Sequence, residues 1–379
     1  MTSIIGVGLI PFGQYLNRTV ESLGVEAALL AMKDAGVSAK QITGAYVANA
    51  LGSRLFGDMT VGQSICAQIG VRRVPVINVE NACASGSAAF HLAWQAIEAG
   101  QCDVAMVLGI EKMSAPGIGL INSGVSDPDT QMGMVTPAGF ALRAKRHMYE
   151  FGTTAEQLAQ VTVKSRWHAQ HNPNAQFQKQ ETIGSVLAAP MIADPLTRSQ
   201  CCPIADGAAA IIVCSDRFAK TFSRAVRVRY SVLTSGGYEN PMDIVRWETD
   251  YRAAQLAYEG AGLGAEDLDV VECHDAFTIA EILHYEALGL CPPGHGGQLV
   301  DAGVTSLGGR IPVNVSGGLL SRGHPIAATA VAQLVELTAQ LRHESGRLQV
   351  EGCRVGLAHC MGGEKAADAK SCTVVILSN

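Results

Sequence analysis

The sequence predicts an α/β protein made of two similar halves, and three observations lead to this prediction. The chain has 379 residues, which is more than one typical domain core contains. Its composition is 48% hydrophobic and 16% charged with 41 Gly, as expected for a large, well-buried α/β enzyme with many tight turns. Finally, β-rich segments alternate with Ala-rich helical segments, and this alternation occurs twice along the chain.

The repeat is clearest between residues 27–50 and 253–276, which align without gaps. Eight of the 24 aligned positions are identical. Each copy reads as a helix closed by Ala-Gly, then a polar connection and a short strand. Agreement through helix, loop and strand indicates an internal duplication, so we expect two homologous halves around a pseudo-twofold axis.

The copies continue in residues 74–97 and 311–341, where a β-rich run leads through a Gly/Ser-rich turn into an Ala-rich helix. The corresponding helix N-termini are expected to face a shared centre. Cys83 opens one of these helices, and His324 lies at the start of the other. Residues 115–225 fit neither copy and are rich in Gly, Pro and polar residues, which predicts an insertion that covers the site.

Charge and hydropathy exclude several classes of function. The net charge is −6 and the estimated pI is about 5.9, so no overall basic field indicates a nucleic-acid partner. No run of about 18 apolar residues is present, and the N-terminus lacks the charged region of a signal peptide. The eleven cysteines show no metal-ligand spacing, which is typical of free thiols in a reducing compartment. We therefore expect a cytoplasmic protein with no membrane span and no metal site.

Cys83 lies where the apolar run VPVINV gives way to a helical pattern. Cysteine is among the most often buried residue types, so one interpretation is a small core side chain. The other interpretation is a nucleophile at a helix N-terminus, where free N–H groups and the helix dipole favour the thiolate. Position alone leaves both interpretations open.

Three further residues share the setting of Cys83. These are His274 in CHDAFT, His324 in SRGHPIAAT and Cys360 in AHCMGG, each after a predicted strand or in a Gly-rich turn. Such positions let side chains point into a cleft, so we predict that the four residues converge. The remaining histidines are interpreted as structural or superficial: His91, His147, His168, His171, His284, His295 and His343.

With these motifs in place, the chain resembles the thiolase superfamily over nearly its whole length. NACASGSAA around Cys83 is similar to the nucleophile segment, SGGLLSRGHPIAAT to the GHPxGxT segment, and HCMGG to the C-terminal CxGG turn. CHDAF, YEALGLCPPG and PLTRSQCCPIADGAAA resemble the sterol-carrier-protein-x type thiolases. The lipid-carrying domain that follows some of those thiolases is expected to be absent.

The resemblance implies the thiolase fold, in which two duplicated βαβαβαββ halves form five layers, αβαβα, with a loop-domain insertion in the first half. On this basis we predict an N-terminal half of residues 1–114 and 215–245. The inserted loop domain is predicted over 115–214 and the C-terminal half over 246–379. The superfamily also implies a homodimer or homotetramer in which strands near the nucleophile segment pair across a twofold axis.

The implied activity is that of an acetyl-CoA C-acyltransferase, which interconverts 3-ketoacyl-CoA plus CoA with acyl-CoA plus acetyl-CoA. Cys83 is assigned as the low-pKa thiol that takes the acyl group. His324 is placed to take its proton or to polarise a thioester carbonyl. Cys360 suits the second step, in which a proton is exchanged with the CoA sulfur or the acetyl methyl group. Coenzyme A is thus a substrate, and no permanently bound cofactor is expected.

Both steps develop negative charge on a carbonyl oxygen. The resemblance implies that backbone N–H groups of Cys83 and Gly362 stabilise one oxyanion, and that His274 with His324 stabilises the other. It also implies a set of substrate-binding residues in the SGG segment: Ser316, Gly317 and Gly318.

Two departures from the sterol-carrier-protein-x pattern leave the substrate and the direction of reaction open. Ala276 replaces the cysteine of the HDCF motif, and Cys360 replaces the asparagine of the HNxG turn. One alternative is a ketoacyl synthase or a carbon–carbon lyase on the same scaffold. Another is an acyl-CoA- or lipid-binding subunit without turnover, because a fold alone does not prove an activity.

Overall fold

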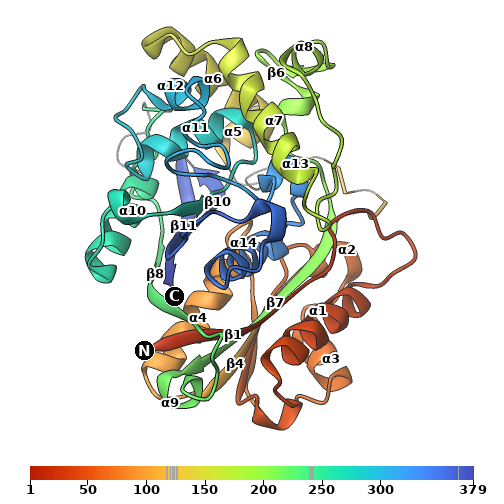
Figure 1. Ribbon diagram of the computed structural model, residues 1–379. Coiled ribbons are helices and arrows are strands. Elements are labelled where there is room, and N and C mark those ends of the chain that lie inside the picture. Colours follow the sequence, from red (N-terminus) through yellow and green to blue (C-terminus); the bar gives the residue numbers. More distant parts are fainter. Residues whose placement is uncertain (117, 120, 122–123, 125–126, 239–242, 366) are drawn as a thin grey trace.

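Nine strands form one large mixed sheet in the computed structural model (Figure 1), which describes residues 1–116, 118–119, 121, 124, 127–238, 243–365 and 367–379. Their order is β3-β2-β4-β7-β1-β8-β11-β10-β9. The first five strands in this order come from the N-terminal part of the chain and the last four from the C-terminal part. The strands are β1 (Thr2–Leu9), β2 (Gly44–Ala48), β3 (Val76–Val79), β4 (Val104–Lys112), β7 (Asp206–Ser215), β8 (Val226–Thr234), β9 (Val270–Glu272), β10 (Val355–Lys365) and β11 (Asp368–Ser378).

The sheet consists of two halves with matching strand order. β1 and β8 join the halves through only three residue pairs, from Thr2↔Val228 to Ile4↔Val226. On one side of this junction the order is β1-β7-β4-β2-β3, and on the other it is β8-β11-β10-β9. A parallel bridge between Val271 and Val313 extends the second half at the place that β3 occupies in the first. The predicted duplication is therefore visible strand by strand.

The helix ends repeat as closely as the strands do. α1 (Val20–Ala35) ends at Gly36 and α10 (Glu248–Ala261) ends at Gly262. Both glycines adopt the left-handed conformation, with φ of 65° and 66°, which glycine adopts without steric cost. In both copies a short 3-10 turn follows, and then the next strand. The aligned Ala-Gly pairs of the sequence predict these helix ends correctly.

Three apolar clusters show that the two half-sheets lie within five layers (Figure 1). One cluster packs the outer helices α1 and α3 (Val61–Gln68) on the first half-sheet. The middle cluster joins α4 (Ser85–Glu98) and α14 (Ile326–Leu341) to strands of both half-sheets. The third packs α10 and α11 (Thr278–Ala287) on the second half-sheet. The αβαβα prediction is confirmed.

The middle layer packs so closely that two glycines are required. A Cβ atom on Gly86 of α4 would lie 2.5 Å from the backbone oxygen of Ala327 in α14. A Cβ atom on Gly109 of β4 would lie 2.4 Å from the same oxygen. Any side chain at either position would push α14 away. These glycines therefore allow the N-terminus of α14 to lie close to α4 and β4.

Two long helices, two short ones and a small hairpin, all within the described residues between β4 and β7, cover one end of the two half-sheets (Figure 1). The structure differs here from the predicted boundaries, and part of the predicted insertion lies outside the described residues. Residues 206–214 belong to β7, which pairs with both β4 and β1 inside the sheet. β8, which was predicted in the first half, pairs with β11 of the second. The elements of the covering region are α5 (Pro128–Gln131), α6 (Thr136–Phe151), α7 (Ala155–Ala169), α8 (Ile183–Leu187), β5 (Met191–Ala193) and β6 (Leu196–Thr197).

The remaining helices are short. They are α2 (Gly52–Phe56), α9 (Asp216–Ala219), α12 (Gly296–Asp301) and α13 (Gly318–Arg322).

No helix among the described residues combines the length and the apolar run that a bilayer crossing requires.

Candidate active site

Cys83 occupies a tight turn between β3 and α4. The preceding residue, Ala82, has a φ of 48°, a conformation that costs a non-glycine residue energy and is often found at functional sites. Ser85 holds the turn, because its hydroxyl accepts from the backbone N–H of Asn81 at 2.7 Å and donates to the oxygen of Ala82 at 2.5 Å. The Cys83 thiol is half-buried, so it faces the interior yet can be reached.

His324 lies beside the thiol in the geometry of a general base. Its Nε2 is 3.3 Å from Sγ of Cys83, and its Nδ1 is 2.7 Å from the hydroxyl of Thr329. The Thr329 hydroxyl donates its single proton to the backbone oxygen of Pro325 at 3.0 Å. It must therefore accept from Nδ1–H of His324, which leaves Nε2 as the acceptor that faces the thiol.

His274 completes a three-residue cluster. Donor atoms of Cys83, His274 and His324 all lie within 4.8 Å of one another. The two imidazole rings meet edge to face, with centroids 5.2 Å apart. Among the described residues, neither ring nitrogen of His274 has a hydrogen-bond partner, although the side chain is only 4% exposed. A buried donor without a partner is costly, so this imidazole is available for a substrate oxygen.

Cys360 approaches the same place from β10. Its Sγ lies 3.2 Å from the backbone oxygen of Cys83, and the thiol is buried. Gly362, two residues on, lies directly against the nucleophile turn, since a Cβ atom there would be 2.5 Å from the oxygen of Asn81. The structure therefore brings together all four predicted side chains, and it places Gly362 beside them.

The protonation states differ from the sequence expectation of a low-pKa thiol. Burial, with a contribution from Glu111, raises the pKa of Cys83 to about 12. The backbone N–H groups of Cys83 and Gly363 lower this pKa, but they do not offset the effect of burial. Burial, together with the charge of Arg322, lowers the pKa of His324 to about 3. The resting pair is thus a neutral thiol beside a neutral imidazole. A thiol in this state needs a proton acceptor before it can attack, and Nε2 of His324 lies 3.3 Å away.

The N–H of Gly363 was given no role in the sequence prediction, which assigned the neighbouring N–H of Gly362 to an oxyanion hole. Gly363 has a φ of 65°, which turns its backbone at the end of the strand. Its N–H lowers the pKa of Cys83, so it lies toward the sulfur. The assignment of Gly362 to an oxyanion hole stays a prediction. The CMGG motif indicates that backbone N–H groups lie near Cys83. It does not indicate which of the two adjacent glycines directs its N–H toward the sulfur.

The three predicted substrate-binding residues make close contacts within the protein. The hydroxyl of Ser316 donates to Glu272 at 2.6 Å. Cβ atoms on Gly317 and Gly318 would lie 2.7 Å from Ala169 and 2.2 Å from Asp275. These contacts explain why the turn needs small residues, and they leave a substrate role for the segment as a prediction.

Two residues near the nucleophile were not identified from the sequence. Glu111 lies at the end of β4 and accepts from the N–H groups of Ala50 and Leu51, and burial raises its pKa to about 7. Cys202 donates its backbone N–H to the oxygen of Ala276 at 2.8 Å. Burial raises the pKa of Cys202, and the charges of Cys201 and Cys83 raise it further. Glu111 ends an apolar run, and Cys202 lies in the polar segment RSQCCPIAD, where no spacing to Cys83 marks it as a neighbour.

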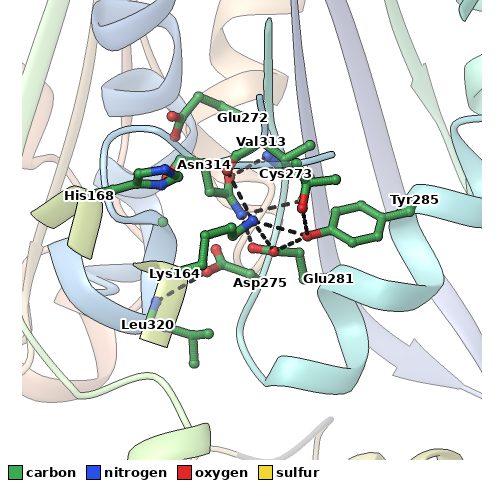
Figure 2. Close-up of polar contacts among 12 residues, drawn as sticks. Lys164, His168, Glu272, Cys273, Asp275, Glu281, Tyr285, Val313, Asn314 and Leu320 are labelled. Atoms are coloured by element: carbon green, nitrogen blue, oxygen red, sulfur yellow. Dashed lines mark hydrogen bonds and ion pairs between the residues drawn. The ribbon is translucent and has the colours of Figure 1, made fainter. Parts of the chain in front are cut away.

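A buried polar network lies next to Cys273 and Asp275, the two neighbours of His274 in the sequence (Figure 2). Lys164 from α7 contacts the carboxylate of Glu281, the hydroxyl of Tyr285 at 3.0 Å and the oxygen of Val313 at 3.1 Å. The amide of Asn314 donates to the same carboxylate at 2.6 Å. Because every one of these side chains is buried, the network joins the covering region rigidly to α11 and to the segment that contains Val313 and Asn314.

Asp275 connects this region to His274, which it follows directly. Its carboxylate accepts from the N–H of Leu319 at 2.7 Å and from that of Leu320 at 3.4 Å (Figure 2 shows Asp275 and Leu320). Burial with the charge of Glu281 raises the pKa of Asp275 well above the usual range. The turn before His324 is thereby held against the loop that carries His274.

Within the part of the chain that the structure describes, two groups of side chains are close enough to hold a metal ion. The first is the cluster of Cys83, His274 and His324, and the second is formed by Asp250, His359 and Cys372. The expectation that no metal is involved stays a prediction.

Comparison with known proteins decides the family. The model for "Thiolase, N-terminal domain" matches residues 2–185, and the model for "Thiolase C-terminal domain-like" matches residues 238–379. The chain belongs to the thiolase family. This thiolase is 41% identical over 369 residues to the benzoylsuccinyl-CoA thiolase subunit BbsB of Thauera aromatica, covering 95% of this chain and 94% of the relative.

Other relatives agree with this assignment. An acetyl-CoA acetyltransferase of Methanothermobacter thermautotrophicus is 38% identical, with 95% of this thiolase and 96% of the relative aligned. Human sterol carrier protein 2 is also 38% identical, over 95% of this chain and 69% of its own length. The resemblance to sterol-carrier-protein-x type thiolases is thus confirmed, and the thiolase is an acyltransferase.

Solved structures confirm the fold. An Ltp2-ChsH2(DUF35) aldolase superposes with a TM-score of 0.84 at 24% identity, covering 100% of this thiolase and 97% of that chain. Human mitochondrial 3-ketoacyl-CoA thiolase in complex with CoA superposes with a TM-score of 0.78 at 18% identity, covering 100% and 98%.

Proposed function

We propose that this thiolase cleaves 3-ketoacyl-CoA with CoA, or runs the reverse condensation, through an acyl group carried on Cys83. The observation that supports this most strongly is the 3.3 Å contact between Sγ of Cys83 and Nε2 of His324. Thr329 fixes the imidazole with its acceptor nitrogen toward the thiol, which is the arrangement that a nucleophile and its base require.

In the first step, Sγ of Cys83 attacks the keto carbon while its proton moves to Nε2 of His324. The bond between the keto carbon and the neighbouring carbon breaks, so Cys83 keeps the acyl group as a thioester. The other fragment leaves as the enolate of acetyl-CoA. Cys360 is placed to donate the proton that converts this enolate into acetyl-CoA, because its thiol lies 3.2 Å from the backbone oxygen of Cys83.

In the second step, Cys360 takes the proton of the CoA thiol, and the resulting thiolate attacks the acyl group on Cys83. The bond to Sγ breaks, Cys83 recovers its proton from His324, and acyl-CoA leaves. Burial and the nearby Cys83 raise the pKa of Cys360 well above its usual range. A buried thiol of this kind holds its proton until a substrate atom is close, which suits a group that both gives and receives protons.

Two sets of donors are proposed for the oxyanions. The N–H groups of Cys83 and of Gly362 or Gly363 serve the carbonyl that Sγ attacks. His274 and His324 serve the enolate oxygen of acetyl-CoA. The support for His274 is that its two ring nitrogens lack partners within the described residues of a buried site. Preorganised donors of this type each contribute on the order of 3 kcal/mol to the transition state.

The substrate class is proposed as 3-ketoacyl-CoA thioesters. One relative is named a benzoylsuccinyl-CoA thiolase subunit and another an acetyl-CoA acetyltransferase. Disappearance of acetoacetyl-CoA and of an aryl 3-ketoacyl-CoA, each with and without CoA, tests the proposal. CoA-dependent loss of either substrate supports a thiolase. Binding without turnover of both supports the alternative of an acyl-CoA-binding subunit. Cleavage that needs no CoA supports a carbon–carbon lyase.

A homodimer is proposed on the exposed edge of β3. This strand pairs only with β2, and its Ile77 is 42% exposed. Phe56 and Met59 are also exposed, at 43% and 77%. An open strand edge with apolar side chains favours pairing with another strand. Light scattering at micromolar concentration is expected to show a dimer or tetramer, and a single 39.7 kDa species would contradict this.

Cytoplasmic location and a place in fatty-acid or lipid metabolism are part of the same proposal. The eleven cysteines are all free, which is consistent with a reducing compartment. Fractionation of cells that produce the protein, followed by immunodetection, tests the location.

A further inference from the structure

The two thiols of the proposed reaction come from different halves of the molecule, and polar side chains link the segments that carry them. Cys83 precedes α4 in the first half, and Cys360 lies on β10 in the second. β11 pairs with β10 in antiparallel register, so that Thr373 lies opposite Cys360 and Ser371 lies opposite Gly362. Both of these β11 residues are hydrogen-bonded to the segment around Cys83.

The first link is a chain of two hydroxyls. Oγ of Ser87, in the first turn of α4, lies 2.6 Å from Oγ1 of Thr373. The Thr373 hydroxyl is 3.0 Å from the backbone oxygen of Cys360, and the Ser87 hydroxyl is 3.1 Å from that of Ala84. Two hydroxyl protons serve these three contacts, so the bond between the hydroxyls is present whichever carbonyl receives the other proton. The chain therefore runs from the residue after Cys83 to the backbone of Cys360.

A second link joins the other side of the nucleophile turn to the same strand. Nδ2 of Asn81 donates to Oγ of Ser371 at 2.8 Å, and the backbone N–H of Asn81 donates to Oγ of Ser85 at 2.7 Å. The two links reach β11 two residues apart, and strand residues two apart point to the same face. One face of β11 therefore contacts the chain on both sides of Cys83.

These hydroxyls interrupt an apolar pattern. Further along the same face of β11, Val375 and Leu377 belong to the middle apolar cluster. Ser87 and Thr373 are equally buried, at 4% and 1% exposed. A buried hydroxyl is costly unless it is hydrogen-bonded, and valine would fill the place of Thr373 without that requirement. The hydroxyl occurs where the strand lies opposite Cys360, which indicates a role in the site beyond packing.

The hydroxyl chain and the cluster of Asp250, His359 and Cys372 lie on opposite faces of β10 and β11. Cys372, the neighbour of Thr373, belongs to the apolar cluster under α10 and α11. His359, the neighbour of Cys360, lies 3.4 Å from Asp250 of α10. Because neighbouring residues of a strand point to opposite faces, Thr373 and Cys360 face α4 instead.

We propose that Ser87 and Thr373 are positioning residues that set the separation of the Cys83 and Cys360 thiols across the boundary between the two halves. They act through the first turn of α4 and the backbone of Cys360. Sγ of Cys360 lies 3.2 Å from the backbone oxygen of Cys83, so a small shift of β10 against α4 changes the path of the exchanged proton. This inference rests on the proposed function for its effect on rate, but not for its effect on the separation of the thiols.

Two substitutions of Thr373 separate the hydroxyl from the packing. Thr373→Val keeps the branched shape and removes the hydroxyl, whereas Thr373→Ser keeps the hydroxyl. We expect kcat to fall about ten- to hundredfold in Thr373→Val and no more than about threefold in Thr373→Ser, with KM little changed. Thr338→Val is the matched control and should keep normal kcat, because this buried hydroxyl donates to the Leu334 oxygen within α14 at 2.6 Å.

A double substitution tests whether the two hydroxyls act as one unit. Ser87→Ala should lower kcat by a factor similar to that of Thr373→Val. The double variant should lose no more than the larger single loss, because each change breaks the same bond. Losses that multiply would overturn the proposal, and so would equal kcat in Thr373→Val and Thr373→Ser.

A cross-linking readout measures the separation without turnover. 1,3-Dibromoacetone alkylates one thiol and then bridges to a second thiol within reach, and peptide mass spectrometry identifies the bridge. We expect a bridge between Cys83 and Cys360 in the wild-type protein. The ratio of bridged to singly alkylated Cys83 should fall about tenfold in Thr373→Val and stay unchanged in Thr338→Val.

An unchanged ratio in Thr373→Val would overturn the inference, as would the absence of this bridge from the wild-type protein. Acyl capture on Cys83 keeps the test separate from the proposed function. If the wild-type enzyme is not acylated by any 3-ketoacyl-CoA, the proposed function fails, and the bridge ratio still decides whether the hydroxyls set the separation of the thiols.

Discussion

The two halves of this thiolase share strands, helix ends and layer order, but they supply the active site unequally. The first half contributes one side chain to the proposed active site, Cys83, at the turn before α4. The second contributes His274, His324 and Cys360. His324 occupies the turn before α14, which is the counterpart of the turn that carries Cys83. Duplication therefore created two facing strand-to-helix turns, and the chemistry requires that they differ.

The halves also differ in what lies behind the reacting groups. The outer layer of the first half is aliphatic, with α1 and α3 packed on the sheet through residues such as Leu23 and Ile65. Behind the second half lie Lys164 with Glu281 and Asp250 with His284, all buried. The half that must hold three reacting groups at fixed angles contains directional polar contacts, because apolar packing alone does not fix the direction of an imidazole or a thiol.

The largest expected effect concerns the resting thiol of the first half. Because burial raises the pKa of Cys83 to about 12, its thiolate fraction at neutral pH is on the order of a thousandfold below that of an ordinary cysteine with pKa about 8.5. Iodoacetamide should therefore alkylate Cys83 slowly without substrate, with a rate that rises through alkaline pH. His324, with a pKa of about 3, stays neutral above about pH 4, so acylation should not fall between pH 5 and 8. Rapid alkylation with a midpoint near pH 7 would instead indicate a stored thiolate–imidazolium pair.

The next effect tests the thiol of the second half. Cys360→Ala should still accept an acyl group on Cys83 but pass it on slowly, with turnover reduced on the order of a hundredfold or more. Single-turnover kinetics with CoA as acceptor measure this step. Cys353→Ala, at another buried cysteine of the same half, is the matched control and should keep normal turnover. Normal deacylation of Cys360→Ala would leave the second step without a base.

The buried polar network around Lys164 predicts that removing one of its charges lowers the free energy of unfolding by more than lost packing alone would. Lys164→Met leaves the carboxylate of Glu281 buried without its cation, which should cost about 3–5 kcal/mol of unfolding free energy (Figure 2). The double change Lys164→Met with Glu281→Leu should recover most of this loss, because it removes both charges. Urea unfolding measures all three proteins. A single change that costs less than about 1 kcal/mol would mean that the network does not stabilise the fold.

The smallest expected effect lies at the start of α1, far from the chemistry. Thr19 caps this helix, since its hydroxyl accepts from the N–H of Ser22 at 3.1 Å. Thr19→Ala should cost about 1 kcal/mol of unfolding free energy without changing turnover. Thr60 occupies the same position before α3 but makes no capping bond, so Thr60→Ala should have no such cost. Equal losses in the two variants would show that the cap is not the cause.

Patterns that repeat along the chain predicted much of the fold and the convergence of the four residues that are proposed to react. The Ala-Gly pairs ending at Gly36 and Gly262 mark equivalent helix ends, because a left-handed residue after a helix leaves the same signature wherever it occurs. The strand-to-helix turns at Cys83 and His324 follow from the same alignment. Their convergence follows from the symmetry of two packed halves.

The features that sequence reasoning missed depend on burial and on partners distant in the chain. The pKa of Cys83 is set by how deeply the turn is enclosed, which no local pattern reveals. His284 was interpreted as structural or superficial and is buried, but its neighbours Asp250 and His274 come from other elements and could not be predicted. β7 was assigned partly to the insertion, because an apolar strand looks the same whether it ends one domain or begins the next.

The most direct test of the account is the location of the acyl group. Brief incubation with acetoacetyl-CoA, acid quench and peptide mass spectrometry should find the acyl adduct on Cys83. No adduct should form in Cys83→Ala, whereas Cys66→Ala, at a buried thiol of the same half, should be acylated normally. An acyl group on Cys360 or Cys202, with Cys83 unmodified, would contradict the assignment of the nucleophile and the division of labour between the two halves.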